Sequence, residues 1–188
     1  MSEIKIYKNT IEAANPVMIA GWPGMGSVAS GVVNYLRRKL KTVRLAEIKL
    51  DPLHTLDSVV VEDGVATFPV SPQNAFYYAK SADLIIFEGE AQLAGQAGIE
   101  LLNKVLDVAQ QFNSKKIYTA AAFPAPVSYK EKPQVYSAVN KKSLSSDVLL
   151  KLGVNPMEEG HISGLNGLLL GFARDRNIDA VCLLATMP

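Results

Sequence analysis

The sequence has one cysteine, Cys182, and two histidines among its 188 residues. A single cysteine cannot close an internal disulfide, and its valine and leucine neighbours are typical of a buried apolar position. Neither His54 nor His161 lies at a spacing that would build a zinc site with the cysteine. The sequence therefore predicts no disulfide framework and no metal centre.

The sequence also lacks an excess of one sign of charge, and it lacks long apolar runs. Lysine and arginine together number 19 against 18 aspartate and glutamate, which gives a formal net charge of +1. Nucleic-acid-binding domains usually carry a strong basic excess, so nucleic acid is not an expected partner. No apolar run approaches the ~20 residues that a membrane helix needs, and the N-terminal segment lacks the apolar core of a signal peptide. We therefore expect a cytoplasmic protein without a membrane partner.

Short apolar runs alternate with helical patterns along the chain, and this alternation predicts an α/β fold. Residues 58–62 and 65–69, joined by Asp63-Gly64, predict a β-hairpin with a type I′ turn. We expect one domain over residues 1–188, built as a three-layer sandwich around a mostly parallel mixed sheet. The other predicted strands cover residues 16–20, 43–50, 84–87, 117–122, 134–139 and 180–185, and the predicted helices cover residues 27–40, 99–112, 145–152 and 165–176.

A glycine-rich turn, residues 21–26, joins the first core strand to the first helix. Residues 24–29 match the pattern G-x-G-x-x-A, which is the context of a dinucleotide-binding turn, and Glu47 follows at about the distance of a ribose partner. The alternative is a structural turn that needs glycine dihedral angles, because the inserted tryptophan and proline make this turn long and stiff. Its candidate ligand or partner residues are Trp22, Pro23, Gly24, Met25 and Gly26.

Residues 158–164 bring carboxylates, an imidazole and a hydroxyl together just before the last helix. Such groups can act in general acid–base or nucleophilic catalysis, but catalytic triads usually converge from separate loops. Ser163 is more simply the N-cap of the last helix. His161, Ser163 and Asn166 therefore remain candidates for a ligand or partner surface.

Glu88 and Glu90 follow a predicted core strand, at the end where α/β proteins bind ligands. Either residue can equally cap the next helix. The sequence contains no G-x-S-x-G nucleophile elbow, and no Walker A lysine follows the glycines. It therefore names no catalytic residue and no cofactor.

Two helices carry features with structural interpretations. Basic residues 37–39 and 41 crowd the last turn of the first helix, where positive charge suits the helix dipole. Gly164, Gly167 and Gly171 share one face of the last helix. Because glycine costs helix stability, this face predicts the close approach of another backbone, from the first helix, the sheet or another subunit.

Three segments together resemble the PAC2 family of proteasome assembly chaperones, namely residues 17–29, 87–90 and 162–170. The resemblance implies a fold similar to nucleoside phosphorylases, homo-oligomers and, in eukaryotic members, assembly of the proteasome α-ring. Proteasome-binding members often end in a hydrophobic residue, a tyrosine and any residue. This sequence ends Thr186-Met187-Pro188 instead, so docking through this end is not expected.

Three hypotheses follow for the function. The leading one is a non-enzymatic assembly chaperone or scaffold of the PAC2 type, with a homo-oligomer and proteasome α subunits as its partners. The alternative is a nucleotide- or nucleoside-binding enzyme or sensor that uses the glycine turn, Glu88 and His161. The third is a homo-oligomer with a structural role, whose interface would use aromatic side chains in apparent loops. Those side chains are Tyr77, Tyr78, Tyr129 and Tyr136.

Overall fold

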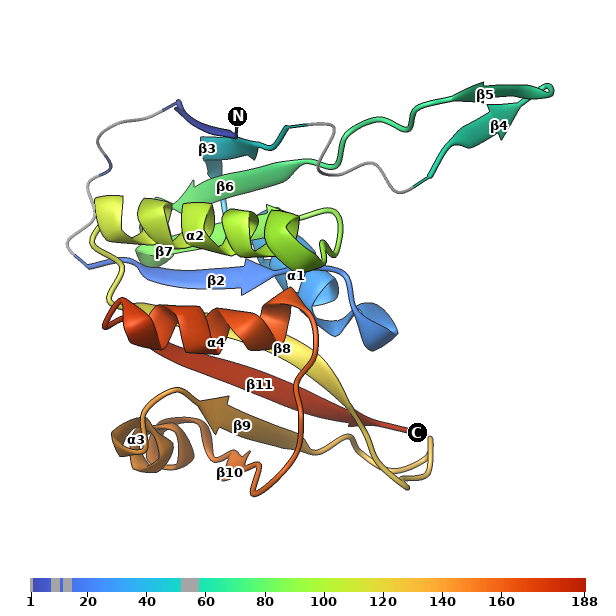
Figure 1. The fold of residues 1–188 in the computed structure, drawn as a ribbon. Helices are drawn as coiled ribbons and strands as arrows, with labels where there is room; N and C mark the ends of the chain where they lie inside the picture. The colour runs from blue at the N-terminus through green and yellow to red at the C-terminus, as the bar shows by residue number, and fades with distance from the viewer. Residues whose placement is uncertain (1, 8–10, 12–14, 52–57) are drawn as a thin grey trace.

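The computed structural model describes residues 2–7, 11, 15–51 and 58–188 (Figure 1). His54 lies outside the described residues. The strands of the main sheet are β1 (Glu3–Ile6), β2 (Val17–Gly21), β3 (Val43–Lys49), β6 (Asn74–Ala79), β7 (Leu84–Gly89), β8 (Lys116–Pro124), β9 (Val135–Val139), β10 (Asn155–Pro156) and β11 (Asp179–Met187). The α-helices are α1 (Val28–Lys39), α2 (Gly95–Gln111), α3 (Ser143–Leu152) and α4 (Leu165–Asp175).

The nine strands lie in the order β1-β3-β6-β7-β2-β8-β11-β9-β10. The four strands β7, β2, β8 and β11 run parallel at the centre of the sheet. Antiparallel pairs flank them, through β6, β3 and β1 on one side and through β9 on the other. The predicted α/β fold with a mixed sheet is confirmed, and its antiparallel part comes from these flanking strands.

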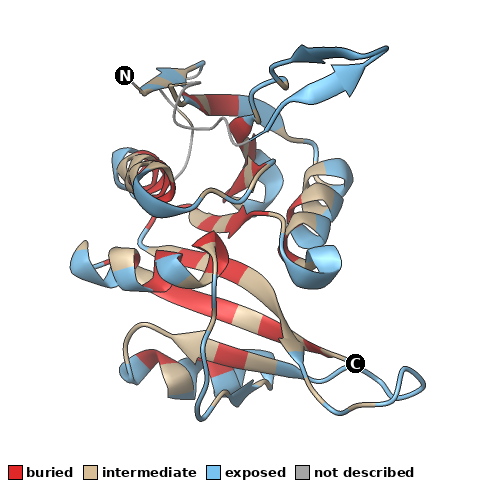
Figure 2. Ribbon diagram, turned by 45° about the vertical axis from the view of Figure 1, so that its right-hand side comes forward, coloured by how far each residue is buried: buried red, intermediate tan, exposed pale blue. Residues whose placement is uncertain are grey.

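Helices cover both faces of the sheet, which confirms the three-layer arrangement (Figures 1 and 2). Along β2, Met18 and Ala20 belong to the large core cluster shared with α2 and α4. The alternate residues Val17 and Ile19 pack into the smaller cluster with α1. A strand buried on both faces needs a continuous apolar run, which is the pattern that predicted it.

Three strands of the main sheet, β1, β6 and the two-residue β10, were missed by the sequence reasoning, and each lacks the signal that the reasoning used. β6 carries two tyrosines and is buried on nearly every residue, so it shows no alternation. β1 is only four residues long. Tyr77 and Tyr78 lie within β6 and Tyr136 lies within β9, whereas the prediction placed them beside loops. Tyr129 does lie between elements, and it is 82% exposed.

The predicted hairpin is present as β4 (Val60–Glu62) and β5 (Val65–Thr67). Asp63 and Gly64 have φ angles of 50° and 80°, the left-handed values that a type I′ turn requires. The hairpin does not join the main sheet but forms a separate two-stranded sheet that extends away from the body (Figure 1). We call residues 58–70 the arm.

The starts of α1 and α4 differ from the predicted caps. Ser27 precedes α1 at the N-cap position, but its φ of 52° is left-handed and its side chain makes no capping bond. The N-cap of α4 is Gly164, so the prediction of Ser163 is wrong. Gln92 replaces it, because its Oε1 accepts a hydrogen bond from Leu165 N at 3.0 Å.

The glycines of the last helix have a nearer partner than predicted. A Cβ on Gly167 would overlap the carbonyl of Ile162, whereas a Cβ on Gly171 would meet nothing within 4 Å. The close backbone is therefore the segment that leads into the same helix. At Gly167 this partner is neither the first helix nor the sheet, and the prediction of another subunit stays a prediction.

Cys182 lies in β11 and is 0% exposed, as predicted for a small buried residue. Burial disfavours the thiolate and raises the pKa of this thiol to about 12. The one native thiol is therefore shielded from reagents in the folded protein.

We expect Gly89→Ala to destabilise the protein by about 1–3 kcal/mol, because the new methyl group would overpack a rigid core. A Cβ at this position would lie 2.5 Å from Nε1 of the buried Trp22. Urea unfolding measures the change. The matched control Gly171→Ala adds the same methyl group in open space on a helix, and it should stabilise by about 0.5–1 kcal/mol. Equal stability of the Gly89→Ala variant and the native protein would contradict the packing described here.

Candidate functional site

The glycine-rich turn is organised around a buried tryptophan. Trp22 is 0% exposed, and its ring lies 4.9 Å from that of Phe87 between centroids. The indole also covers Gly89, where no side chain would fit. Its Nε1 has no acceptor among the described residues. Trp22 was expected on a ligand or partner surface, but it is a core residue whose ring packs against Phe87 beneath the glycine turn.

The side-chain amide of Asn166 holds the backbone of Trp22. Its Oδ1 accepts hydrogen bonds from Trp22 N at 3.1 Å and from Thr119 Oγ1 at 3.2 Å. Its Nδ2 donates to Trp22 O at 3.1 Å. All three residues are buried, and together they connect the start of α4, the end of β2 and the middle of β8. A buried polar group that lost these partners would be costly, so the network fixes the position of the turn.

A second amide holds the next part of the turn. Gln92 Nε2 donates to Pro23 O at 2.6 Å while its Oε1 caps Leu165. Ser27 N donates back to Gly24 O at 2.9 Å, and Gly26 adopts a left-handed φ of 62°. The N–H groups of Trp22 and Ser27 are therefore used inside the protein and cannot bind a phosphate.

A groove of about 670 Å³ lies over the carboxyl end of β8, among the first turns of α1, α2 and α4. Its lining includes five of the predicted site residues, which are Gly24, Met25, His161, Ser163 and Asn166. Its apolar rim includes Met25, Ile99 and Leu168, which are 61%, 45% and 50% exposed. Large exposed apolar side chains around a hollow are typical of a surface that binds a partner.

The two glutamates at the end of β7 do not line this groove. Glu88 faces α1, where its carboxylate accepts from Asn34 Nδ2 at 3.2 Å and lies 2.9 Å from Arg37 Nε. Glu90 Oε2 accepts from Gln73 N at 2.8 Å. Both residues connect elements of the scaffold, and neither meets His161 in a shared site.

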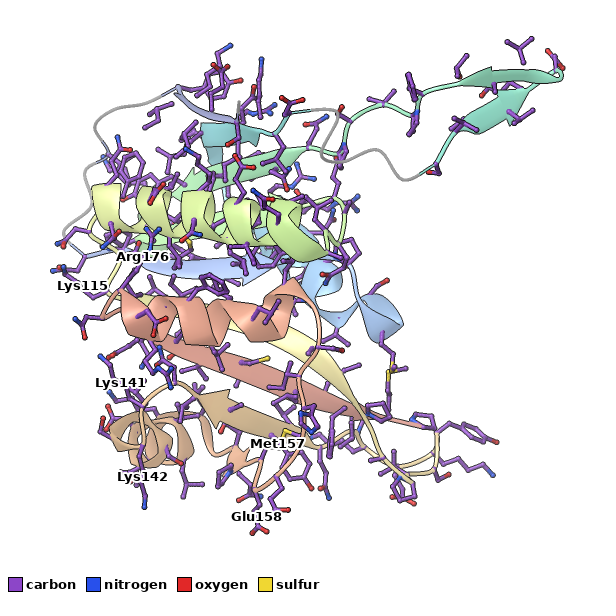
Figure 3. The ribbon with its side chains drawn as sticks, in the orientation of Figure 1. Lys115, Lys141, Lys142, Met157, Glu158 and Arg176 are labelled. Atoms are coloured by element: carbon purple, nitrogen blue, oxygen red, sulfur yellow. The ribbon has the colours of Figure 1, made fainter. Side chains whose placement is uncertain are left out.

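The polar groups before α4 do not form a catalytic set. His161 and Ser163 line the groove, but no hydrogen bond or ion pair joins either of them to a carboxylate among the described residues. Glu158 and Glu159 line a different hollow, next to Phe123 and Tyr136. Figure 3 shows Glu158 at the outer edge of the molecule beside β10. The histidine therefore lacks the orienting acid that a catalytic base needs.

Glu47, the candidate ribose partner, lies far from the glycine turn in the sheet. It belongs to β3, which β6 and β7 separate from β2. A hydrogen bond with Tyr7 lowers the pKa of Glu47, and the nearby charge of Arg44 acts in the same direction. A dinucleotide-binding turn needs its acidic partner on a strand beside the turn, so Glu47 is not the ribose partner of residues 24–29.

Comparison with known proteins places these features in a family. A sequence model of the PAC2 family matches residues 18–188. This chain belongs to the PAC2 family. The match begins in β2 and therefore includes the glycine turn, the groove and the residues that hold them.

The structure of this chain is similar to that of PbaB of Pyrococcus furiosus, with a TM-score of 0.81 and 29% sequence identity. PbaB is described as an archaeal proteasome activator. The alignment covers 99% of this chain and 80% of PbaB. PbaA of the same organism is described as an archaeal homolog of proteasome-assembly chaperone, and its structure is similar with a TM-score of 0.76 and 21% sequence identity. The alignment covers 100% of this chain and 76% of the PbaA chain. The uncharacterized protein MJ1210 of Methanocaldococcus jannaschii is 24% identical over 93% of this chain, which spans only 66% of that protein.

Two residues that hold the PAC2 turn were missed in the sequence. Thr119 is a polar residue in the otherwise apolar or aromatic run 117–122, and that interruption was its available signal. Gln92 follows the end of β7, where α/β proteins place functional loops, but nothing in its neighbours points to a contact with Pro23 or Leu165. Both act through contacts between segments far apart in the sequence.

Among the described residues, no three histidine, cysteine, aspartate or glutamate side chains are grouped so that they could hold a metal ion. No helix in this part of the chain is long and apolar enough to cross a membrane.

We expect Asn166→Ala to destabilise this PAC2 protein by about 2–4 kcal/mol, because the peptide N–H and C=O of Trp22 both lose a buried partner. Thr119→Val keeps the shape and removes one donor from the same network, so it should cost about 1 kcal/mol. Chemical denaturation monitored by the fluorescence of the single tryptophan measures both changes. If the two substitutions cost the same, Asn166 does not hold the turn.

Proposed function

We propose that this PAC2 protein is a non-enzymatic assembly chaperone or scaffold that binds proteasome α subunits. The observation that carries the proposal is the family match over residues 18–188, together with the likeness to PbaB and PbaA over nearly the whole chain. PbaB is described as a proteasome activator and PbaA as a homolog of proteasome-assembly chaperone. The region common to all three proteins includes the groove.

The geometry of the groove supports binding rather than chemistry. The amides of Asn166 and Gln92 are engaged with backbone groups, and His161 has no carboxylate partner among the described residues. The exposed rim is instead apolar, with Met25, Ile99 and Leu168 around the hollow. We therefore assign this groove to an apolar segment of a proteasome α subunit.

Two further parts of the proposal concern the state of the protein. We infer that it works as a homo-oligomer in the cytoplasm, with residues 1–188 as one domain. The buried, unpaired thiol of Cys182 supports a reducing compartment. Exposed apolar residues on several elements support self-association.

Binding of the native chain to purified proteasome α subunits of its own organism, measured by native mass spectrometry and calorimetry, tests the proposal. We expect Leu168→Glu to weaken this binding by about tenfold or more, because it places a charge on the rim of the groove. The matched control Leu150→Glu makes the same change on α3, where the leucine is 83% exposed and outside the groove. It should bind as the native chain does. A native chain that binds no α subunit would overturn the proposed function.

We expect nucleotides, nucleosides and phosphate to leave the melting temperature unchanged, because the N–H groups of Trp22 and Ser27 bind acceptors inside the protein and Glu47 lies elsewhere. Differential scanning fluorimetry is the measurement. A true ligand present at 100 times its Kd would stabilise the fold by about 2.7 kcal/mol, a shift that is easily seen. Such a shift with any of these compounds would favour the enzyme or sensor hypothesis instead.

A further inference from the structure

The arm has one apolar face that none of the described residues covers. Val61 pairs with Ala66 across the two strands, so their side chains lie on the same face. Val59 and Phe68, which flank this pair by two residues on each strand, continue the same face. Val59, Val61 and Phe68 are 54%, 62% and 73% exposed. The opposite face is mixed, because it carries Glu62 and Thr67 beside its two valines.

An isolated two-stranded hairpin is at best marginally stable in water. All residues of β4 and β5 are exposed, and the arm stands clear of the body in Figures 2 and 3. Its apolar face therefore lacks the packing that normally holds a hairpin in place. This face needs a surface from outside its own chain.

A matching surface lies on the α1 side of the main sheet. There, β8 and β11 are only partly covered, and a groove of about 390 Å³ opens between α1 and the end of α3. We call it the α1 groove. Its lining is apolar apart from one threonine and one tyrosine hydroxyl, with Val28, Val32, Tyr118, Val135, Leu152 and Leu183 among its side chains.

The exposed side of α1 extends this surface toward a positive charge. Val28, Val32, Tyr35 and Lys39 recur at helical spacing, so they share one face of the helix. Val32 and Tyr35 are 39% and 59% exposed, and Lys39 Nζ lies 5.7 Å from the ring centre of Tyr35. The stripe therefore begins at the apolar groove and ends in a cation.

The arm and this stripe match in length and in charge. From Val28 to Lys39 the helix rises ~16 Å at 1.5 Å per residue. From Val59 to Asp63 an extended strand covers ~13 Å at 3.3 Å per residue. The arm ends in Glu62 and Asp63, which are both exposed, so its acidic tip would reach the basic end of α1 while its valines cover the groove.

We propose that the arm of one copy of this chain lies in the α1 groove of a second copy, with its acidic tip at Lys39. Within one copy the contact is not made, because the arm connects β3 to β6 and projects outward, whereas the groove lies beyond β7 and β2 (Figure 1). The contact joins two different surfaces, so it closes either as a reciprocal dimer or as a ring. This inference rests on the homo-oligomer in the proposed function and names its interface.

Self-association without any proteasome subunit present tests the arm by analytical ultracentrifugation. Val61→Glu, on the apolar face, should raise the Kd of self-association by about tenfold or more. Val65→Glu is the matched control, since Val65 is also 62% exposed but belongs to the mixed face. It should leave the Kd nearly unchanged. Lys39→Glu should weaken association, because it places a negative charge beside the acidic tip of the arm.

A disulfide test locates the contact directly. Because Cys182 is buried, an introduced cysteine is the one accessible thiol in each variant. Mixing a Val32→Cys chain with a Phe68→Cys chain under mild oxidation should give a covalent dimer that contains one of each chain, identified by mass spectrometry. Replacing the second chain by Thr67→Cys, on the opposite face of the arm, should give far less of it.

A native chain that stays monomeric at every concentration would overturn the arm contact. So would an oligomer in which Val61→Glu and Val65→Glu behave alike and the Val32–Phe68 pair does not cross-link. A chain that binds α subunits but does not self-associate would retain the chaperone function without this interface. An oligomer that is held by the arm but does not bind α subunits would support the arm contact and contradict the proposed chaperone function.

Discussion

The hydrogen bonds between the Asn166 amide and the peptide group of Trp22 are the contact on which the rest of the structure depends. One side chain satisfies both the N–H and the C=O of a buried residue and also accepts from Thr119. Because unsatisfied buried polar groups are costly, packing these three segments in another arrangement that breaks these bonds would be unfavourable. That arrangement sets the start of α4 over the end of β2 and forms one wall of the groove.

These hydrogen bonds also explain how a turn with the sequence pattern of a nucleotide-binding site comes to serve internal packing in this protein. A phosphate-binding turn keeps its N–H groups free and lets a ligand approach the glycines. In this turn the peptide of Trp22 is bound by Asn166, and the carbonyl of Pro23 is bound by Gln92. The nearby glycine that most needs to be glycine, Gly89, makes room for the indole ring. The same residues thus serve packing, and they leave a groove whose exposed rim is apolar.

The molecule presents apolar surface on both sides of its sheet. The groove beside the turn lies among the first turns of α1, α2 and α4, and the α1 groove lies over β8 and β11 on the opposite face. The proposed partner and the proposed second copy of the chain would use different openings, whose linings share Ala29. No side-chain substitution on the arm alters the lining of the groove at the turn.

The sequence by itself determined the α/β class, the central strands, the helices, the hairpin turn and the family resemblance, because these depend on local periodicity and on short motifs. It also identified five residues of the groove. Only the tertiary structure decided that Trp22 is buried, that Glu88 and Glu90 connect scaffold elements, that Glu47 is remote, and that Gln92 and Thr119 matter. Hydrogen bonds between residues such as Trp22 and Asn166 join positions 144 apart, and strand order decides which of them meet. Neither these long-range hydrogen bonds nor the order of the strands produces a periodic pattern in the sequence, so neither could be predicted from it.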